Sequence, residues 1–186
     1  MGKQPPQPEG GSGSGGAGGG REGPAGLARE IYKRGAFDSP AQEAFLNLMR
    51  TGGVLGGAFE RLFKRHGLSS ATYNALRILR GAGERGRRCS EVGEHLVAAV
   101  PDVTRLIDRL EKAGLARRSR GGEDRRVVLV RITASGRALL RRLDRPVLEL
   151  HEAQLGHLSR RELEQLSTLL CRARERVRWD EDCEAR

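Results

Sequence analysis

Residues 101–136 read PDVTRLIDRL EKAGLARRSR GGEDRRVVLV RITASG, and this stretch decides the fold. Its first part has apolar residues at helical spacing, a proline suited to a first helical position and Gly114 suited to a helix end. The period then changes, because 115–119 and 126–132 are strand-like and Gly121-Gly122 lies between them as a turn. We therefore predict a helix that begins at Pro101, followed by a two-stranded hairpin.

Two further helices are predicted before this segment. One runs from about Ser70 to Arg80, and a short one is capped by Ser90 and contains Val92, Leu96 and Val97. The resulting order of helix, short helix, turn, helix and hairpin is that of a winged helix-turn-helix module, which we place at 68–133.

Long helices are predicted on both sides of this module, over 39–66 and 134–178. The first begins at a capping box, Ser39-Pro-Ala-Gln42, and Thr133 is expected to cap a second that Pro146 kinks. The last helix opens at another capping box, Ser159-Arg-Arg-Glu162. The apolar residues of the first helix recur at helical spacing: Phe45, Leu48, Met49, Leu55, Phe59, Leu62 and Phe63. The chain is thus expected to be mainly α with a small β-hairpin wing.

The two ends of the chain are polar. Residues 1–26 are almost wholly Gly, Pro, Ser and Gln, so we expect a disordered tail, with order beginning near Ser39. Residues 179–186 are expected to form a short polar tail. The remainder is long enough for one hydrophobic core, which predicts one domain.

The positive charge is concentrated on the predicted helix and hairpin. The formal net charge is +10, which favours a polyanionic partner. The helix face opposite the apolar one carries Asp102, Thr104, Arg105, Asp108 and Arg109, and a helix fits the major groove of DNA. The hairpin carries Arg117, Arg118, Arg120, Arg125 and Arg126, and arginine suits a narrow minor groove. For any single arginine, a phosphate neighbour or an internal salt bridge is an equally good interpretation.

Two segments resemble signatures of the MarR family of bacterial regulators. Residues 100–115 resemble the family's recognition helix, and 123–136 resemble its wing, an Asp-x-Arg followed by a strand and Thr-x-x-Gly. The resemblance extends over about Ser39 to Val177.

This resemblance implies a homodimer that is held together by its N- and C-terminal helices and reads a palindromic site in double-stranded DNA. It implies recognition-helix roles for Asp102, Thr104, Arg105 and Arg109 after Pro101, and wing roles for Arg120, Arg125 and Arg126. Asp124 matches an aspartate that shapes the wing through a salt bridge. The family further implies a repressor that responds to a small-molecule effector bound between the dimerisation helices and the DNA-binding lobe. That cleft could be lined by Phe45, Leu48, Met49, Leu55, Phe59 and Tyr73. We interpret these as core residues, so the effector-binding residues stay unknown. An alternative is a winged-helix protein–protein adaptor that does not contact DNA.

Other functions find little support in the sequence. The sequence contains no nucleophile elbow, P-loop or dinucleotide fingerprint, so we expect neither an enzyme nor a cofactor. The spacing of His151 and His157 is not that of metal ligands. Cys89 suits either a buried structural thiol or a redox switch at a helix start. With no long apolar run and no signal peptide, we expect a cytoplasmic protein without membrane contact.

Overall fold

The computed structural model of the chain describes residues 26–120 and 127–184, with side chains as far as residue 175. The predicted tail over 1–26 lies almost entirely outside the described residues. So do the predicted turn Gly121-Gly122 and the wing residues Asp124, Arg125 and Arg126.

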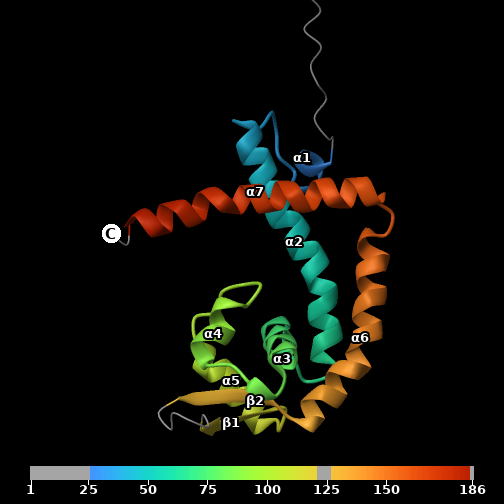
Figure 1. The fold of residues 1–186 in the computed structure, drawn as a ribbon. Coiled ribbons are helices and arrows are strands. Elements are labelled where there is room, and N and C mark those ends of the chain that lie inside the picture. Colours follow the sequence, from blue (N-terminus) through green and yellow to red (C-terminus); the bar gives the residue numbers. More distant parts are fainter. Residues whose placement is uncertain (1–25, 121–126, 185–186) are drawn as a thin grey trace, which may run out of the picture. The chain divides into compact units, whose positions relative to one another are not determined.

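The described chain is mostly helical, with one antiparallel pair of strands (Figure 1). The elements are α1 (Leu27–Glu30), α2 (Pro40–Lys64), α3 (Ser70–Ala82), the 3-10 turn η1 (Gly83–Arg85), α4 (Cys89–Glu94), α5 (Val103–Lys112), β1 (Ala116–Arg120), β2 (Val128–Ile132), α6 (Ala134–Leu155) and α7 (Arg160–Glu184). In the hairpin Ala116 pairs with Ile132 and Arg120 with Val128. Helix α3, short α4, α5 and this hairpin confirm the predicted winged helix-turn-helix.

The chain forms two compact units that divide after Arg50. The first unit contains α1, which the sequence did not predict because order was expected only from Ser39. The carboxylate of Glu30 in this helix accepts a bond from Nε of Arg50 at 3.2 Å. Ser39 caps α2 as predicted, since its Oγ accepts from the backbone N–H of Gln42 at 3.1 Å, but the Gln42 side chain accepts from Asp38 N–H instead of Ser39.

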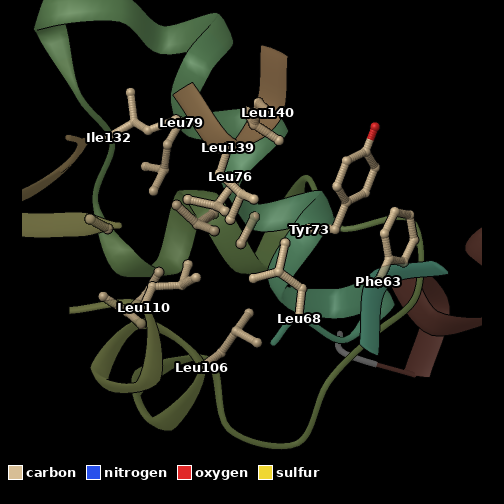
Figure 2. Close-up of a cluster of buried hydrophobic side chains, with 14 of the residues drawn as sticks. Phe63, Leu68, Tyr73, Leu76, Leu79, Leu106, Leu110, Ile132, Leu139 and Leu140 are labelled. Atoms are coloured by element: carbon tan, nitrogen blue, oxygen red, sulfur yellow. The ribbon is translucent and has the colours of Figure 1, made fainter. Parts of the chain in front are cut away.

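The core of the second unit lies among α3, α5, the hairpin and α6 (Figure 2). Leu76 and Leu79 of α3, Ile107 of α5 and Leu140 of α6 have no exposed surface. The ring of Phe63, at the end of α2, stacks on that of Tyr73 with centroids 4.1 Å apart. Burying this many aliphatic side chains holds the inner face of α5 against α3 and leaves its outer face to solvent.

Helix α4 starts earlier and ends sooner than predicted. It begins at Cys89, ahead of Ser90, and the backbone N–H of Arg88 donates to the Glu91 carboxylate at 3.0 Å. Because the helix ends at Glu94, Leu96 and Val97 follow it in the turn, where the N–H of Val97 donates to the Asn74 side chain at 2.8 Å.

The start of α5 also differs from the prediction. The helix begins at Val103, two residues after Pro101, because Asp102 is the N-cap and its Oδ1 accepts from the N–H of Arg105 at 2.9 Å. At the other end the chain turns at Gly114, whose φ of 68° confirms the predicted stop.

Helices α6 and α7 begin where they were predicted. Thr133 Oγ1 accepts from the N–H of Gly136 at 3.0 Å, and the N–H of Ser159 donates to Glu162 at 2.8 Å. Pro146 lies inside α6, and α7 runs on to Glu184, beyond the predicted end at 178.

Three apolar residues of α2 that were expected in the core are exposed in the single chain. Phe45 is 61% exposed, Met49 60% and Leu48 46%. Helical spacing identifies an apolar face without telling whether the same chain or another molecule covers it.

Candidate nucleic-acid interface

The outer face of α5 is polar and cationic. Thr104, Arg105 and Arg109 are exposed, whereas Leu106, Ile107 and Leu110 of the opposite face are buried. A shallow hollow on the outer face is lined by Arg105, Asp108, Arg109 and Lys112. Such a helix presents a row of donors to solvent, as a helix that enters a major groove must do.

Side chains of the first turn of α5 are held by local bonds. Nε of Arg105 lies 3.1 Å from Oδ2 of Asp102, and Nε of Arg109 donates to the carbonyl of Arg105 at 3.3 Å. Arg105 nevertheless keeps 84% of its side-chain surface exposed, so its guanidinium can reach a ligand. Asp102 acts here as a helix cap, which shapes the interface from its edge.

The arginines of the first wing strand differ in their exposure. Arg117 and Arg120 are exposed, whereas Arg118 is turned toward α5 and has 27% of its side-chain surface exposed. Nη1 of Arg118 donates to Oδ1 of Asp108 at 2.6 Å and also bonds the carboxylate of Glu111. These hydrogen bonds, the one to Asp108 foremost, raise the pKa of Arg118 above its usual value and keep it charged.

A third backbone segment supports the hairpin. Arg87 N–H donates to the carbonyl of Val130 at 3.0 Å, and Val130 N–H donates back to the Arg87 carbonyl at 2.7 Å. Nε of Arg131 donates to the carbonyl of Glu84 at 2.7 Å. The part of β2 that contains Val130 and Arg131, which we call the root of the wing, is therefore hydrogen-bonded to the turn that follows α3.

Helix α3 is also tied to α6 by a bidentate ion pair. Nη1 and Nη2 of Arg80 donate to the two carboxylate oxygens of Asp144 at 2.8 and 2.9 Å. The hydrogen bonds from Arg80 lower the pKa of Asp144, and the same bonds raise the pKa of Arg80. The parallel fork geometry fixes the orientation of α6 against α3 at this point.

The structure sorts the predicted site residues into four groups. Thr104, Arg105 and Arg109 of α5 and Arg117 and Arg120 of β1 are exposed, while Pro101 and Asp102 precede the helix. Asp108 and Arg118 bond each other. Asp124, Arg125 and Arg126 lie outside the described residues. Sequence reasoning missed Lys112 and Glu111, although their spacing from Arg109 and Asp108 along a helix could have indicated both.

Within residues 26–120 and 127–175, no three His, Cys, Asp or Glu side chains gather as metal ligands would. Cys89 is half-buried and packs against the core. No helix in the described part of the chain is both long and apolar enough to cross a membrane.

A groove in the second unit lies between the C-terminal half of α2 and α6. Its volume is about 300 Å³. It combines apolar side chains with two arginines, and its lining residues are Ala58, Arg61, Leu62, Arg65, Pro146, Glu149 and Leu150. Glu149 accepts a bond from Nε of Arg145 at 2.7 Å, which leaves Arg61 and Arg65 as the groove's unmatched positive charges among its lining residues.

Comparisons with known proteins point to one group. The model of the MarR family matches residues 68–128. A solved MarR transcription factor from Planctomyces limnophilus is 44% identical, with a TM-score of 0.56, over 73% of this chain and 98% of that one.

Two further relatives agree with this result. The HTH-type transcriptional repressor IacR of Pseudomonas putida is 29% identical over 68% of this chain and 74% of its own length. Sco3205, a MarR family transcriptional regulator from Streptomyces coelicolor solved in complex with DNA, is 19% identical with a TM-score of 0.68. That match covers 77% of this chain and 91% of Sco3205, and it supports the fold alone.

Proposed function

The chain belongs to the MarR family of transcriptional regulators, and on this premise we propose that it represses transcription by binding a palindromic DNA operator as a homodimer. The observation that carries this proposal is the cationic outer face of α5 beside the exposed arginines of β1. A relative that is named a repressor, IacR, supports the same function.

In this proposal α5 enters the major groove. Arg105 and Arg109 are the side chains suited to base edges, since arginine forms bidentate bonds with guanine. Lys112, one turn further along the same face, is suited to a phosphate. Arg117 and Arg120 extend the contact toward the adjacent minor groove.

The homodimer is proposed from exposed apolar side chains on long helices. Leu148 of α6 is 67% exposed and Leu169 of α7 59%, in addition to Phe45 and Met49 of α2. Soluble proteins rarely leave such side chains uncovered on several elements, and a second copy is the partner that the family suggests. Two recognition helices then read half-sites about 34 Å apart, in successive major grooves.

An effector response is proposed from the groove between α2 and α6. Leu62 and Leu150 offer an apolar contact, and Arg61 and Arg65 offer cations, a combination that fits an aromatic carboxylic acid. We expect benzoate or cinnamate to release the protein from DNA, and Arg61→Gln to reduce this effect without changing DNA affinity in the absence of the acid. If Arg61→Gln responds like the wild type, the groove is not the effector site.

The test of DNA binding uses the purified protein with a duplex from its own upstream region and a random duplex, over a series of salt concentrations. Selective binding with a steep salt dependence is expected. Arg109→Ala should weaken binding to the selected duplex by roughly 1–3 kcal/mol more than binding to the random one. Weak and equal binding to both duplexes would instead favour the protein–protein adaptor.

A further inference from the structure

Arg118 joins the wing to the recognition helix by three bonds. Besides the bonds from its guanidinium to Asp108 and Glu111, its backbone N–H donates to Oε1 of Glu111 at 2.6 Å. Glu111 therefore holds both the main chain and the side chain of the same residue. The other two arginines of β1, Arg117 and Arg120, are exposed.

We infer that Arg118 is a positioning residue that sets the wing against the recognition helix, and that Asp108 acts through it instead of reading a base. This inference rests on the proposed DNA-binding function. It reassigns two residues that the sequence placed among the direct contacts.

We call the bonds from Arg118 to Asp108 and Glu111 the clamp. The charges around Asp108 explain why it is needed. Asp108 lies in the hollow between Arg105, Arg109 and Lys112, where a bare carboxylate would repel DNA phosphates. Arg118 covers this carboxylate from the wing side, and the Asp108 and Glu111 side chains are themselves only 44% and 30% exposed. Both bonds leave from Nη1 of Arg118, so two carboxylates balance its charge and make it less available to a phosphate.

The clamp bears on specificity more than on general affinity. If the wing and α5 keep a fixed separation, major- and minor-groove contacts can form together only on a duplex of matching shape. Loss of the clamp frees the wing to find phosphates independently. Binding to the selected duplex should then weaken, while binding to random DNA changes little.

The first experiment measures the free protein by amide hydrogen exchange. In Arg118→Gln the backbone amides of 116–120 should exchange about fivefold to tenfold faster than in the wild type, because the strand loses the two side-chain bonds of its attachment to α5. Arg117→Gln removes the same charge from the exposed face of the same strand and should leave exchange unchanged. Equal exchange in Arg118→Gln and the wild type would overturn the inference.

The second experiment measures DNA affinity against salt. A residue that contacts a phosphate contributes about 0.9 to the slope of log K against log salt. Arg118→Gln should keep the wild-type slope while its preference for the selected duplex falls about tenfold. A slope reduced by about one unit would identify Arg118 as a phosphate contact and overturn the inference.

A double variant tests the reassignment of Asp108. If Asp108 acts through Arg118, then Asp108→Asn combined with Arg118→Gln should lose no more selectivity than Arg118→Gln alone. Additive losses would show that Asp108 contacts DNA on its own.

Arg118→Lys keeps the positive charge and the aliphatic part of the side chain but lacks the planar guanidinium. It replaces Arg118→Gln in every assay if Arg118→Gln does not fold. A wild type that binds both duplexes equally would refute the proposed function, while hydrogen exchange would still decide whether the clamp positions the wing.

Discussion

Replacing Gly86 by alanine tests how the root of the wing is built. Gly86 has a φ of 72°, and a Cβ added to it would lie 2.7 Å from the carbonyl oxygen of Val130 and 2.9 Å from Cγ of Arg131. Both neighbours belong to β2. The backbone oxygen is the acceptor that Arg87 uses to attach its segment to the hairpin, so it cannot move without loosening that attachment.

The expected cost has two parts. A side chain in this region of φ and ψ costs on the order of 1–3 kcal/mol in backbone strain. Displacing the Val130 carbonyl also weakens the two hydrogen bonds that it and its N–H share with Arg87, at about 0.5–1.5 kcal/mol each. Gly86→Ala should therefore lower the free energy of unfolding by about 2–6 kcal/mol.

Gly83 supplies a matched control. Its φ of 58° is also positive, but no atom lies within 4 Å of an added Cβ. Gly83→Ala should cost the strain alone, so the two variants should differ by about 1–3 kcal/mol. Urea unfolding followed by circular dichroism measures both, at one fixed protein concentration because association affects stability. Equal midpoints for the two variants would show that close approach to β2 plays no part.

Three more predictions concern the contacts that stabilise the helices: an ion pair, a helix cap and a core side chain. Asp144→Asn should cost about 1 kcal/mol or less at neutral pH, since the Arg80 and Asp144 side chains are 30% and 43% exposed. Because the pKa of Asp144 is lowered in the folded state, the stabilisation by its ion pair with Arg80 is fully present above about pH 4. In unfolding experiments at decreasing pH, the difference in stability between the variant and the wild type should disappear as the pH falls through that lowered pKa. Asp102→Ala should cost about 1 kcal/mol in urea unfolding and weaken DNA binding by fraying the first turn of α5, whereas Asp102→Asn should keep the cap and both properties. Leu140→Ala removes a fully buried side chain and should cost about 2–5 kcal/mol in the same assay, and a loss below about 1 kcal/mol would contradict its place in the core.

The fold was predictable because local signals agreed with the tertiary structure. The change from helical to strand-like spacing after Gly114 located the hairpin, and the caps at Thr133 and Ser159 located α6 and α7. At the start of α5 two signals competed. Pro101 suits a first helical position, but Asp102 can accept a hydrogen bond from the helix, and that bond decided the boundary.

The site was less predictable, because exposure depends on contacts between elements. Alternation along β1 indicates that neighbouring arginines point in opposite directions, but it does not tell which of them face α5. Only the packing of β1 on α5 separates Arg118 from Arg117. For the same reason the apolar spacing of α2 could not reveal that Phe45 is left exposed in the single chain.

The position of Pro146 makes the stiffness of α6 uneven along its length. Two residues before it, Asp144 accepts two hydrogen bonds from Arg80 of α3, so this part of the helix is held against the winged helix-turn-helix module. Proline has no N–H, so the carbonyl one turn earlier loses its usual donor, and the helix bends most easily at that point. Pro146 also lines the groove between α2 and α6. A molecule bound in that groove would therefore contact α6 in its most compliant turn, the same turn that contains Asp144.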